Sequence, residues 1–240
     1  MIHPTEISGK YDLSGGVFQS VATRYDRTNS LISLGLNGLW QRELVREVQR
    51  VPHITILDVA CGTGALTRRL SRLKETHVTG IDSSEAMLAV ACTKGQAEGR
   101  PLFLPGFAQE LPLPDCSFKV VTVAYGLRNF ADRGLALQQM HRVLEPGGKV
   151  FILEFSLQAA GTGDTGRFLA LQRMYIRHVM PLLGWLGTGD KKAYKYLSDS
   201  VAAFPHPVQL CDEMNDAGFR HVAYRRLLPG VVVLFTGEKQ

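Results

Sequence analysis

The sequence predicts an α/β fold: a three-layer, doubly wound sandwich around a mostly parallel sheet that ends in an antiparallel hairpin. The middle of the chain alternates short β-type runs with helical patterns, which is the rhythm of parallel strands joined by crossover helices. Two early runs each end in an aspartate, and the last two runs follow one another directly. With 240 residues, 45% of them apolar, the chain suits one domain with a large core.

Five β-type runs define the parallel part of the sheet. They cover residues 54–57, 77–81, 102–104, 118–124 and 149–155. Three helices are expected between these strands. The first begins at Ala65, the second follows a cap at Ser83 or Ser84, and the third follows a cap at Asp132. The first shows the spacing of an amphipathic helix, with Leu66, Leu70 and Leu73 on one face.

The remainder of the chain is expected to extend this sheet and to cover one end of it. A helical stretch is predicted from about 165 to 203, and a second helix from Pro207 to near Gly218. Residues 221–227 and 231–236 form the hairpin. We interpret residues 1–240 as one domain, in which 1–50 and about 157–205 form a helical cover over one end of the sheet.

Composition excludes several classes of protein. No run approaches the ~18 apolar residues of a transmembrane helix, and no secretory signal begins the chain, so a cytoplasmic protein is expected. The four cysteines lack metal-binding or disulfide spacing, so no metal is expected. The net charge of +5 suits anionic partners without choosing among them, and no nucleic-acid module is visible.

A glycine loop follows the first predicted strand. Its sequence, DVACGTG over residues 58–64, places Gly62 and Gly64 where backbone can approach a ligand at a helix N-terminus. A dinucleotide fingerprint requires a third glycine where Thr67 stands, which weakens a nicotinamide interpretation, and the GKS or GKT of a phosphate loop is absent. A turn without a ligand stays open as an alternative.

An adenosyl ligand carrying an amino-acid group explains the two acidic strand ends better. Asp58 would point at its ammonium group, and Asp82 would take both ribose hydroxyls. S-adenosylmethionine is therefore the best candidate cofactor.

Longer strings resemble one family. They are YDRTNSLISLG over 25–35, the glycine loop, YGLRN over 125–129, RVLEPGG over 142–148 and AYKYL over 193–197. Together they resemble the ubiquinone/menaquinone biosynthesis C-methyltransferases, the UbiE/MenG family, over about residues 18–239.

This resemblance implies a class I S-adenosylmethionine-dependent methyltransferase fold and methyl transfer to a ring carbon of a prenylated quinol. The acceptor would be demethylmenaquinol or the methoxy-benzoquinol precursor of ubiquinone. The cofactor-binding residues expected on this basis are Asp58, Gly62, Thr63, Gly64, Asp82, Ser83, Met87, Phe107 and Ala108.

Three residues are candidates for the chemistry. A quinol becomes more nucleophilic as its phenolate, and we expect Arg128 to stabilise the developing phenolate at the carboxyl edge of the sheet. Asn129 and Tyr25 would orient the acceptor or the amino-acid end of the cofactor. A structural ion pair is the alternative role for Arg128, and simple packing is the alternative for Tyr25.

The sequence departs from the family pattern at Thr28, Asn37, Phe107, Tyr125 and Glu145. Phe107 removes a polar contact near the adenine, and Asn37 puts the identity of the acceptor in doubt. A methyltransferase for another phenolic acceptor, or a cofactor-binding partner without catalysis, therefore remains an alternative.

The implied lipid substrate also favours peripheral contact with the inner membrane. Arg42, Arg46 and Arg50 form a stripe opposite Leu44 and Val48, which is either such a contact or an ordinary solvated face. A homodimer is left open.

Overall fold

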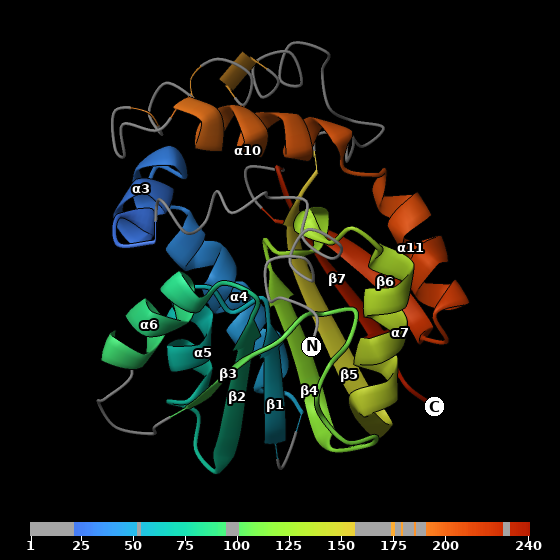
Figure 1. Cartoon of the computed structure of the whole chain (residues 1–240). Helices are drawn as coiled ribbons and strands as arrows, with labels where there is room; N and C mark the ends of the chain where they lie inside the picture. The colour runs from blue at the N-terminus through green and yellow to red at the C-terminus, as the bar shows by residue number, and fades with distance from the viewer. Residues whose placement is uncertain are drawn as a thin grey trace, which may run out of the picture.

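In the computed structural model, residues 22–51, 54–94, 101–156, 174, 175, 179, 185, 191–227 and 231–240 are described. They form a seven-stranded sheet of order β3-β2-β1-β4-β5-β7-β6 (Figure 1). The strands are β1 Ile54–Val59, β2 Thr76–Asp82, β3 Leu102–Pro105, β4 Phe118–Ala124, β5 Leu144–Phe155, β6 Arg220–Leu227 and β7 Val232–Glu238. The first five pair in parallel, which confirms the predicted order of β-units.

Helices cover both faces of the sheet. They are α3 Tyr25–Ile32, α4 Asn37–Val48, α5 Ala65–Leu70, α6 Glu85–Lys94, the short 3-10 helix η1 Leu127–Asn129, α7 Arg133–Val143, α10 Lys191–Ala203 and α11 Pro207–Asp216. In β1, Ile56 packs in the cluster that contains α4 and α5, while Leu57 packs with α7 and α11. Both side chains are fully buried, as expected for a parallel strand between two helical layers.

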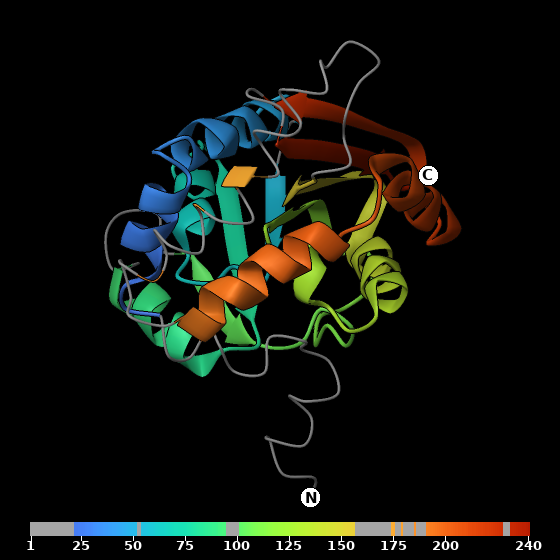
Figure 2. The ribbon, with the colours of Figure 1, turned by 90° about the horizontal axis from the view of Figure 1, so that it is seen from above.

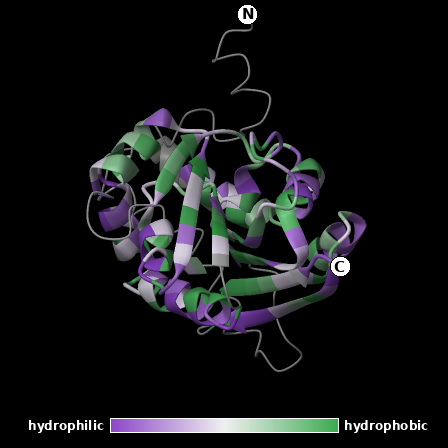
Figure 3. Ribbon diagram, turned by 90° about the horizontal axis from the view of Figure 1, so that it is seen from below, coloured by the Kyte–Doolittle hydropathy of each residue, from purple (hydrophilic) through white to green (hydrophobic). Residues whose placement is uncertain are grey.

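The last two strands form the predicted antiparallel hairpin. β7 lies between β5 and β6 and pairs antiparallel with both, so Ile152 faces Phe235. Figure 3 shows β7 mostly hydrophobic and the edge strand β6 mostly hydrophilic. Arginines on β6 protect an exposed edge against pairing with another chain.

Two predicted caps can be located. Ser84, not Ser83, caps α6, because its hydroxyl accepts from Met87 N at 3.3 Å. Asp132 caps α7 by accepting from Leu135 N at 2.8 Å. Leu73 lies beyond the end of α5, although it still packs on the core.

The start of β5 differs most from the predicted boundary. β5 begins at Leu144 instead of Lys149, because Leu144 already pairs with Phe118 and a register shift absorbs the turn residues. Gly147 takes a left-handed conformation within that irregular segment, with φ of 70°. Of the helix expected over about 165–203, α10 is seen, and most of 165–190 lies outside the described residues.

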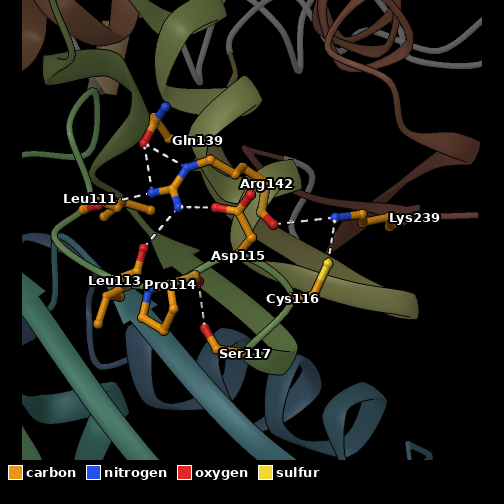
Figure 4. Close-up of polar contacts among 9 residues, drawn as sticks. All are labelled: Leu111, Leu113, Pro114, Asp115, Cys116, Ser117, Gln139, Arg142 and Lys239. Carbon is orange, nitrogen blue, oxygen red and sulfur yellow. Dashed lines mark hydrogen bonds and ion pairs between the residues drawn. The ribbon is translucent and has the colours of Figure 1, made fainter.

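Arg142, which opens the RVLEPGG string, organises the loop after the short strand β3 (Figure 4). Its guanidinium donates to the carbonyls of Leu111 and Leu113 at 2.9 and 2.8 Å and pairs with Asp115 at 2.6 Å. Lys239 closes the other side by donating to the carbonyl of Arg142 at 3.2 Å. Arg142 therefore holds the loop over residues 111–115 in place.

Across the described parts of the chain, no helix is both long and apolar enough to cross a membrane.

Candidate active site

The candidate site lies at the carboxyl ends of the parallel strands, where open α/β sheets bind ligands. A pocket there holds about 620 Å³ of empty space, part of which is open to solvent. A second hollow of about 460 Å³ adjoins it and shares five wall residues, including Tyr25, Gly62 and Tyr125. Figures 1 and 2 show α10 lying across this end of the sheet, with α3 beside it.

The glycine loop forms the floor between the two hollows. Gly62 and Gly64 have φ of 55° and 74°, in the left-handed region that favours glycine. A Cβ at Gly64 would lie 2.8 Å from a ring carbon of Phe103, whereas one at Gly62 would meet nothing within 4 Å. Gly64 therefore serves close packing, and Gly62 presents open backbone to both hollows.

Asp58, at the end of β1, is 1% exposed and lines the second hollow. Its carboxylate accepts from the hydroxyls of Thr67 at 2.6 Å and Thr122 at 2.8 Å. Burial raises the pKa of Asp58 to about 6, although these two hydrogen bonds act in the opposite direction. Thr67, which stands where a dinucleotide fingerprint has glycine, thus has a definite role in holding this carboxylate.

We expect Asp58→Asn to change how stability depends on pH. Because the pKa of Asp58 is raised in the folded state, its contribution to stability is fully present below its unfolded pKa of about 3.8 and is lost as pH rises through about 6. Asparagine fits the site, since a threonine hydroxyl both donates and accepts. The free energy of unfolding of Asp58→Asn, relative to the parent protein, should therefore rise by roughly 2 kcal/mol between about pH 4.5 and about pH 7.5.

Urea denaturation at several pH values measures this difference. Asp216→Asn, on the exposed end of α11, is the matched control and should show a much smaller change. A difference for Asp58→Asn that does not vary with pH would contradict the raised pKa.

Asp82 ends β2 and lines the first pocket. One carboxylate oxygen accepts from Gly62 N at 2.7 Å, and the other accepts from Ser84 N at 2.8 Å. Backbone N–H groups of the glycine loop and of the start of α6 therefore hold both oxygens in place. The neighbouring Ser83, Met87, Phe107 and Ala108 line the same pocket.

Thr63 lines the second hollow, and its hydroxyl is engaged by the protein itself. It donates to Asp26 Oδ1 at 2.5 Å, and Asp26 Oδ2 pairs with Lys94 at 2.7 Å. Asp26 therefore ties α3 to both the glycine loop and α6. No local sequence pattern identifies Asp26 as a site residue, because its partners Thr63 and Lys94 are distant in the chain.

Two of the three candidate chemical residues face the pockets. Tyr25 lines both hollows, and burial is the main reason that its pKa is raised. Asn129 lines the first pocket, where its Oδ1 accepts from the hydroxyl of Tyr196 on α10 at 3.1 Å. That bond connects the YGLRN string to the helix above it.

Arg128 is placed differently from the other two candidates. Its side chain is 3% exposed and pairs with the fully buried Glu154 at 2.6 Å, and neither pocket is lined by it. The same Nη1 donates to the carbonyl of Tyr125 at 2.6 Å. The geometry therefore favours the structural ion pair over direct contact with a phenolate, because the guanidinium charge is already compensated.

Two polar groups in the pocket walls were noted in the sequence only as departures from a family. Tyr125 lines both hollows, has φ of 61° and carries a buried hydroxyl without a hydrogen-bond partner among the described residues. Asn37 Oδ1 lies at the second hollow. It is likewise buried and has no hydrogen-bond partner in the described part of the chain. Unpaired buried polar atoms in a pocket wall indicate groups that a ligand satisfies.

The strand order, the glycine loop and the acidic end of β2 define the class I S-adenosylmethionine-dependent methyltransferase fold. A methyltransferase from Thermotoga maritima, described as a possible histamine N-methyltransferase, superposes with a TM-score of 0.66 at 18% identity, covering 93% of this chain and 98% of that one. The sequence model of the ubiE/COQ5 methyltransferase family matches residues 7–239, and the chain belongs to this family. The resemblance and the fold predicted from the sequence are thereby confirmed.

Curated relatives match over nearly their whole length. The ubiquinone/menaquinone biosynthesis C-methyltransferase UbiE of Shewanella frigidimarina is 38% identical over 98% of this chain and 93% of its own. The demethylmenaquinone methyltransferase of Deinococcus radiodurans is 40% identical over 93% and 91%.

Proposed function

We propose that this protein transfers a methyl group from S-adenosylmethionine to a ring carbon of a prenylated quinol. The observation that carries the proposal is the pocket at the carboxyl edge, where Asp82 and the open backbone of Gly62 meet. Membership of the ubiE/COQ5 family and the names of the two relatives support the choice of acceptor.

The residues of the first pocket fit an adenosyl group. Asp82 has acceptor capacity for ribose hydroxyls, and Met87, Phe107 and Ala108 offer apolar surface for an adenine ring. The second hollow, with Asp58 and Thr63, suits an amino-acid end that carries both charges. When bound, S-adenosylmethionine supplies an electrophilic methyl group.

The remaining wall residues would hold the acceptor. Tyr25, Asn129 and the unpartnered hydroxyl of Tyr125 provide hydrogen-bonding groups around the junction of the two hollows. Holding the ring carbon in line with the methyl group is the main catalytic task, because orientation alone contributes several kcal/mol to a displacement. We assign Arg128 a positioning role, since it fixes the Tyr125 carbonyl instead of facing the pocket.

The proposal treats the chain as one domain in which α3, α4 and α10 cover the acceptor site. Tyr196 bonds Asn129, and Asp26 bonds Thr63, so two covering helices are linked directly to the pocket walls. Of the predicted cover over 1–50 and about 157–205, residues 1–21 lie outside the described residues, and so do almost all of 157–190.

A methyl-transfer assay with two acceptors tests the proposal. The protein receives S-adenosylmethionine with reduced demethylmenaquinol or the reduced methoxy-benzoquinol precursor of ubiquinone, and mass spectrometry reports the products. We expect a gain of one methyl group on the ring of at least one acceptor. Measurable cofactor binding without product on either ring would contradict the proposal and favour another phenolic acceptor, an alternative to which the unpartnered Asn37 points.

A further inference from the structure

Three exposed leucines lie where α3 turns into α4. The exposed fractions of Leu31, Leu34 and Leu39 are 44%, 67% and 51%. They fall within nine consecutive residues around one helix–helix corner, which we call the α3–α4 corner, defined as residues 31–39. Scattered single exposed leucines are ordinary, but such a local group marks an interaction site.

Leu34 occupies a position where glycine is favoured. It has φ of 50°, Gly35 N bonds to Ser30 O at 2.7 Å, and Leu34 N bonds to Leu31 O at 3.0 Å. This is a Schellman motif, whose left-handed residue is usually glycine. Leucine in this conformation costs about 1–2 kcal/mol. Leu34 thus places a bulky, solvent-exposed side chain at a position where glycine would make the fold more stable.

Basic residues flank the corner on both sides. Arg27 is exposed and shares the outward face of α3 with Leu31, which lies four residues further along the helix. Beyond Leu39 lies the exposed Arg42. Arg69 also borders the corner, because one of its guanidinium nitrogens lies 3.6 Å from where a Cβ on Gly38 would be. Further along α4, Arg46 and Arg50 of the stripe noted in the sequence pair with Glu43 and Glu47, which Arg225 of β6 also contacts.

The inward faces of the same two helices line the candidate site. Tyr25 and Asn29 of α3, with Asn37 of α4, border the second hollow. The leucines therefore lie on the outer side of the wall behind which the acceptor is proposed to bind. A substrate with a prenyl tail partitions into a bilayer, so a docking surface beside its site shortens its path.

We propose that the α3–α4 corner docks on an anionic lipid bilayer, with Leu31, Leu34 and Leu39 entering the interface and the flanking arginines meeting lipid phosphates. The combination of apolar residues with a basic rim is that of interfacial helices. This inference rests on the proposed function for its choice of a lipid as partner.

Thermal unfolding of Leu34→Gly and vesicle binding of Leu31→Ser/Leu34→Gly test the corner in two ways. The melting temperature should rise by about 2–4 °C, because glycine relieves the left-handed strain. Vesicle binding is measured by flotation with a three-to-one mixture of phosphatidylcholine and phosphatidylglycerol. The partition coefficient of Leu31→Ser/Leu34→Gly should be about tenfold lower than that of the parent, because two leucine side chains are no longer buried in the bilayer interface. Leu102→Ala, which removes another exposed leucine on the edge strand β3, is the matched control and should bind as the parent does.

The charge part of the proposal is tested separately. Arg27→Glu and raised salt should both weaken binding, and vesicles of phosphatidylcholine alone should bind poorly. Unchanged flotation of Leu31→Ser/Leu34→Gly would overturn the inference. So would a dimer in size-exclusion chromatography that Leu34→Gly dissociates, because a second copy would then cover the corner.

A short-tail acceptor separates this inference from the proposed function. Leu31→Ser/Leu34→Gly should methylate demethylmenaquinol with a single isoprene unit at the parent rate, and lose activity only on long-tail quinol embedded in vesicles. If the parent methylates quinol and its vesicle binding does not depend on the corner, the docking surface is wrong and the proposed function stands. If the parent methylates no quinol, the proposed function fails whatever the vesicles show.

Discussion

Replacing Glu154 with leucine is expected to lower the free energy of unfolding by about 3–5 kcal/mol, because it leaves the Arg128 guanidinium buried without a counter-charge. Glu154 is fully buried and accepts from Arg128 Nη1 at 2.6 Å and from Phe155 N at 2.9 Å. Without Glu154, the buried Arg128 side chain on η1 keeps its charge but loses its carboxylate partner on β5. Urea denaturation at neutral pH measures the loss.

The double variant Arg128→Leu/Glu154→Leu separates the pair's structural role from its role in the site. Replacing both partners of a buried ion pair by apolar residues is often nearly neutral, so we expect most of the stability to return. Turnover should nevertheless stay reduced by about tenfold or more, since the Tyr125 carbonyl has lost its donor. The dissociation constant for S-adenosylmethionine should change less than turnover.

Each alternative outcome identifies a different role for Arg128. Parental turnover in the folded double variant would reduce Arg128 to a structural partner of Glu154. Equal losses of turnover and cofactor affinity would contradict the assigned positioning role. A double variant as unstable as Glu154→Leu alone would mean that the hydrogen bonds to backbone, and not the charge, dominate the stability of this pair.

The sheet was predictable because its determinants are local. Each parallel strand reads as an apolar run, and the glycines and caps at Gly62, Ser84 and Asp132 lie next to the strands and helices that they organise. The start of β5 was misplaced because Pro146 and the two glycines that follow it resemble a turn, whereas pairing of Leu144 with Phe118 incorporates them into an irregular strand. That pairing depends on tertiary context, which periodicity does not contain.

The site was predictable in its location and less so in the roles of its residues. Residue type and strand end place Asp82 and Asn129 at the pocket, but the same reasoning predicts that Arg128 faces the acceptor, whereas the fold pairs it with the buried Glu154. The two are far apart in the chain, and Glu154 lies in an otherwise apolar run. Conversely, the unpartnered hydroxyl of Tyr125 is a property of the folded wall that no sequence pattern contains.

The largest effect on ligand binding is expected at Asp82. We expect Asp82→Asn to weaken S-adenosylmethionine binding by about 100-fold or more, measured by isothermal titration calorimetry. In the parent, both oxygens accept backbone N–H bonds, from Gly62 and Ser84, and the charged carboxylate is a strong acceptor for a ligand hydroxyl. An asparagine NH₂ group must oppose one of those N–H donors, which leaves a buried donor unsatisfied and removes the charge that strengthens the other bonds.

Glu85→Gln is the matched control, because it removes the same charge from an exposed position at the start of α6. Thermal shifts provide a second readout: S-adenosylmethionine at 100 times its dissociation constant should stabilise the parent and Glu85→Gln by about 2.7 kcal/mol and leave Asp82→Asn nearly unshifted. Parental affinity in Asp82→Asn would show that the pocket binds its ligand without this carboxylate, and the assignment of the first pocket to an adenosyl group would then be wrong. Weak binding by Asp82→Asn together with a large drop in its own melting temperature would instead assign Asp82 to ordering the glycine loop, since Gly62 is the residue that it holds.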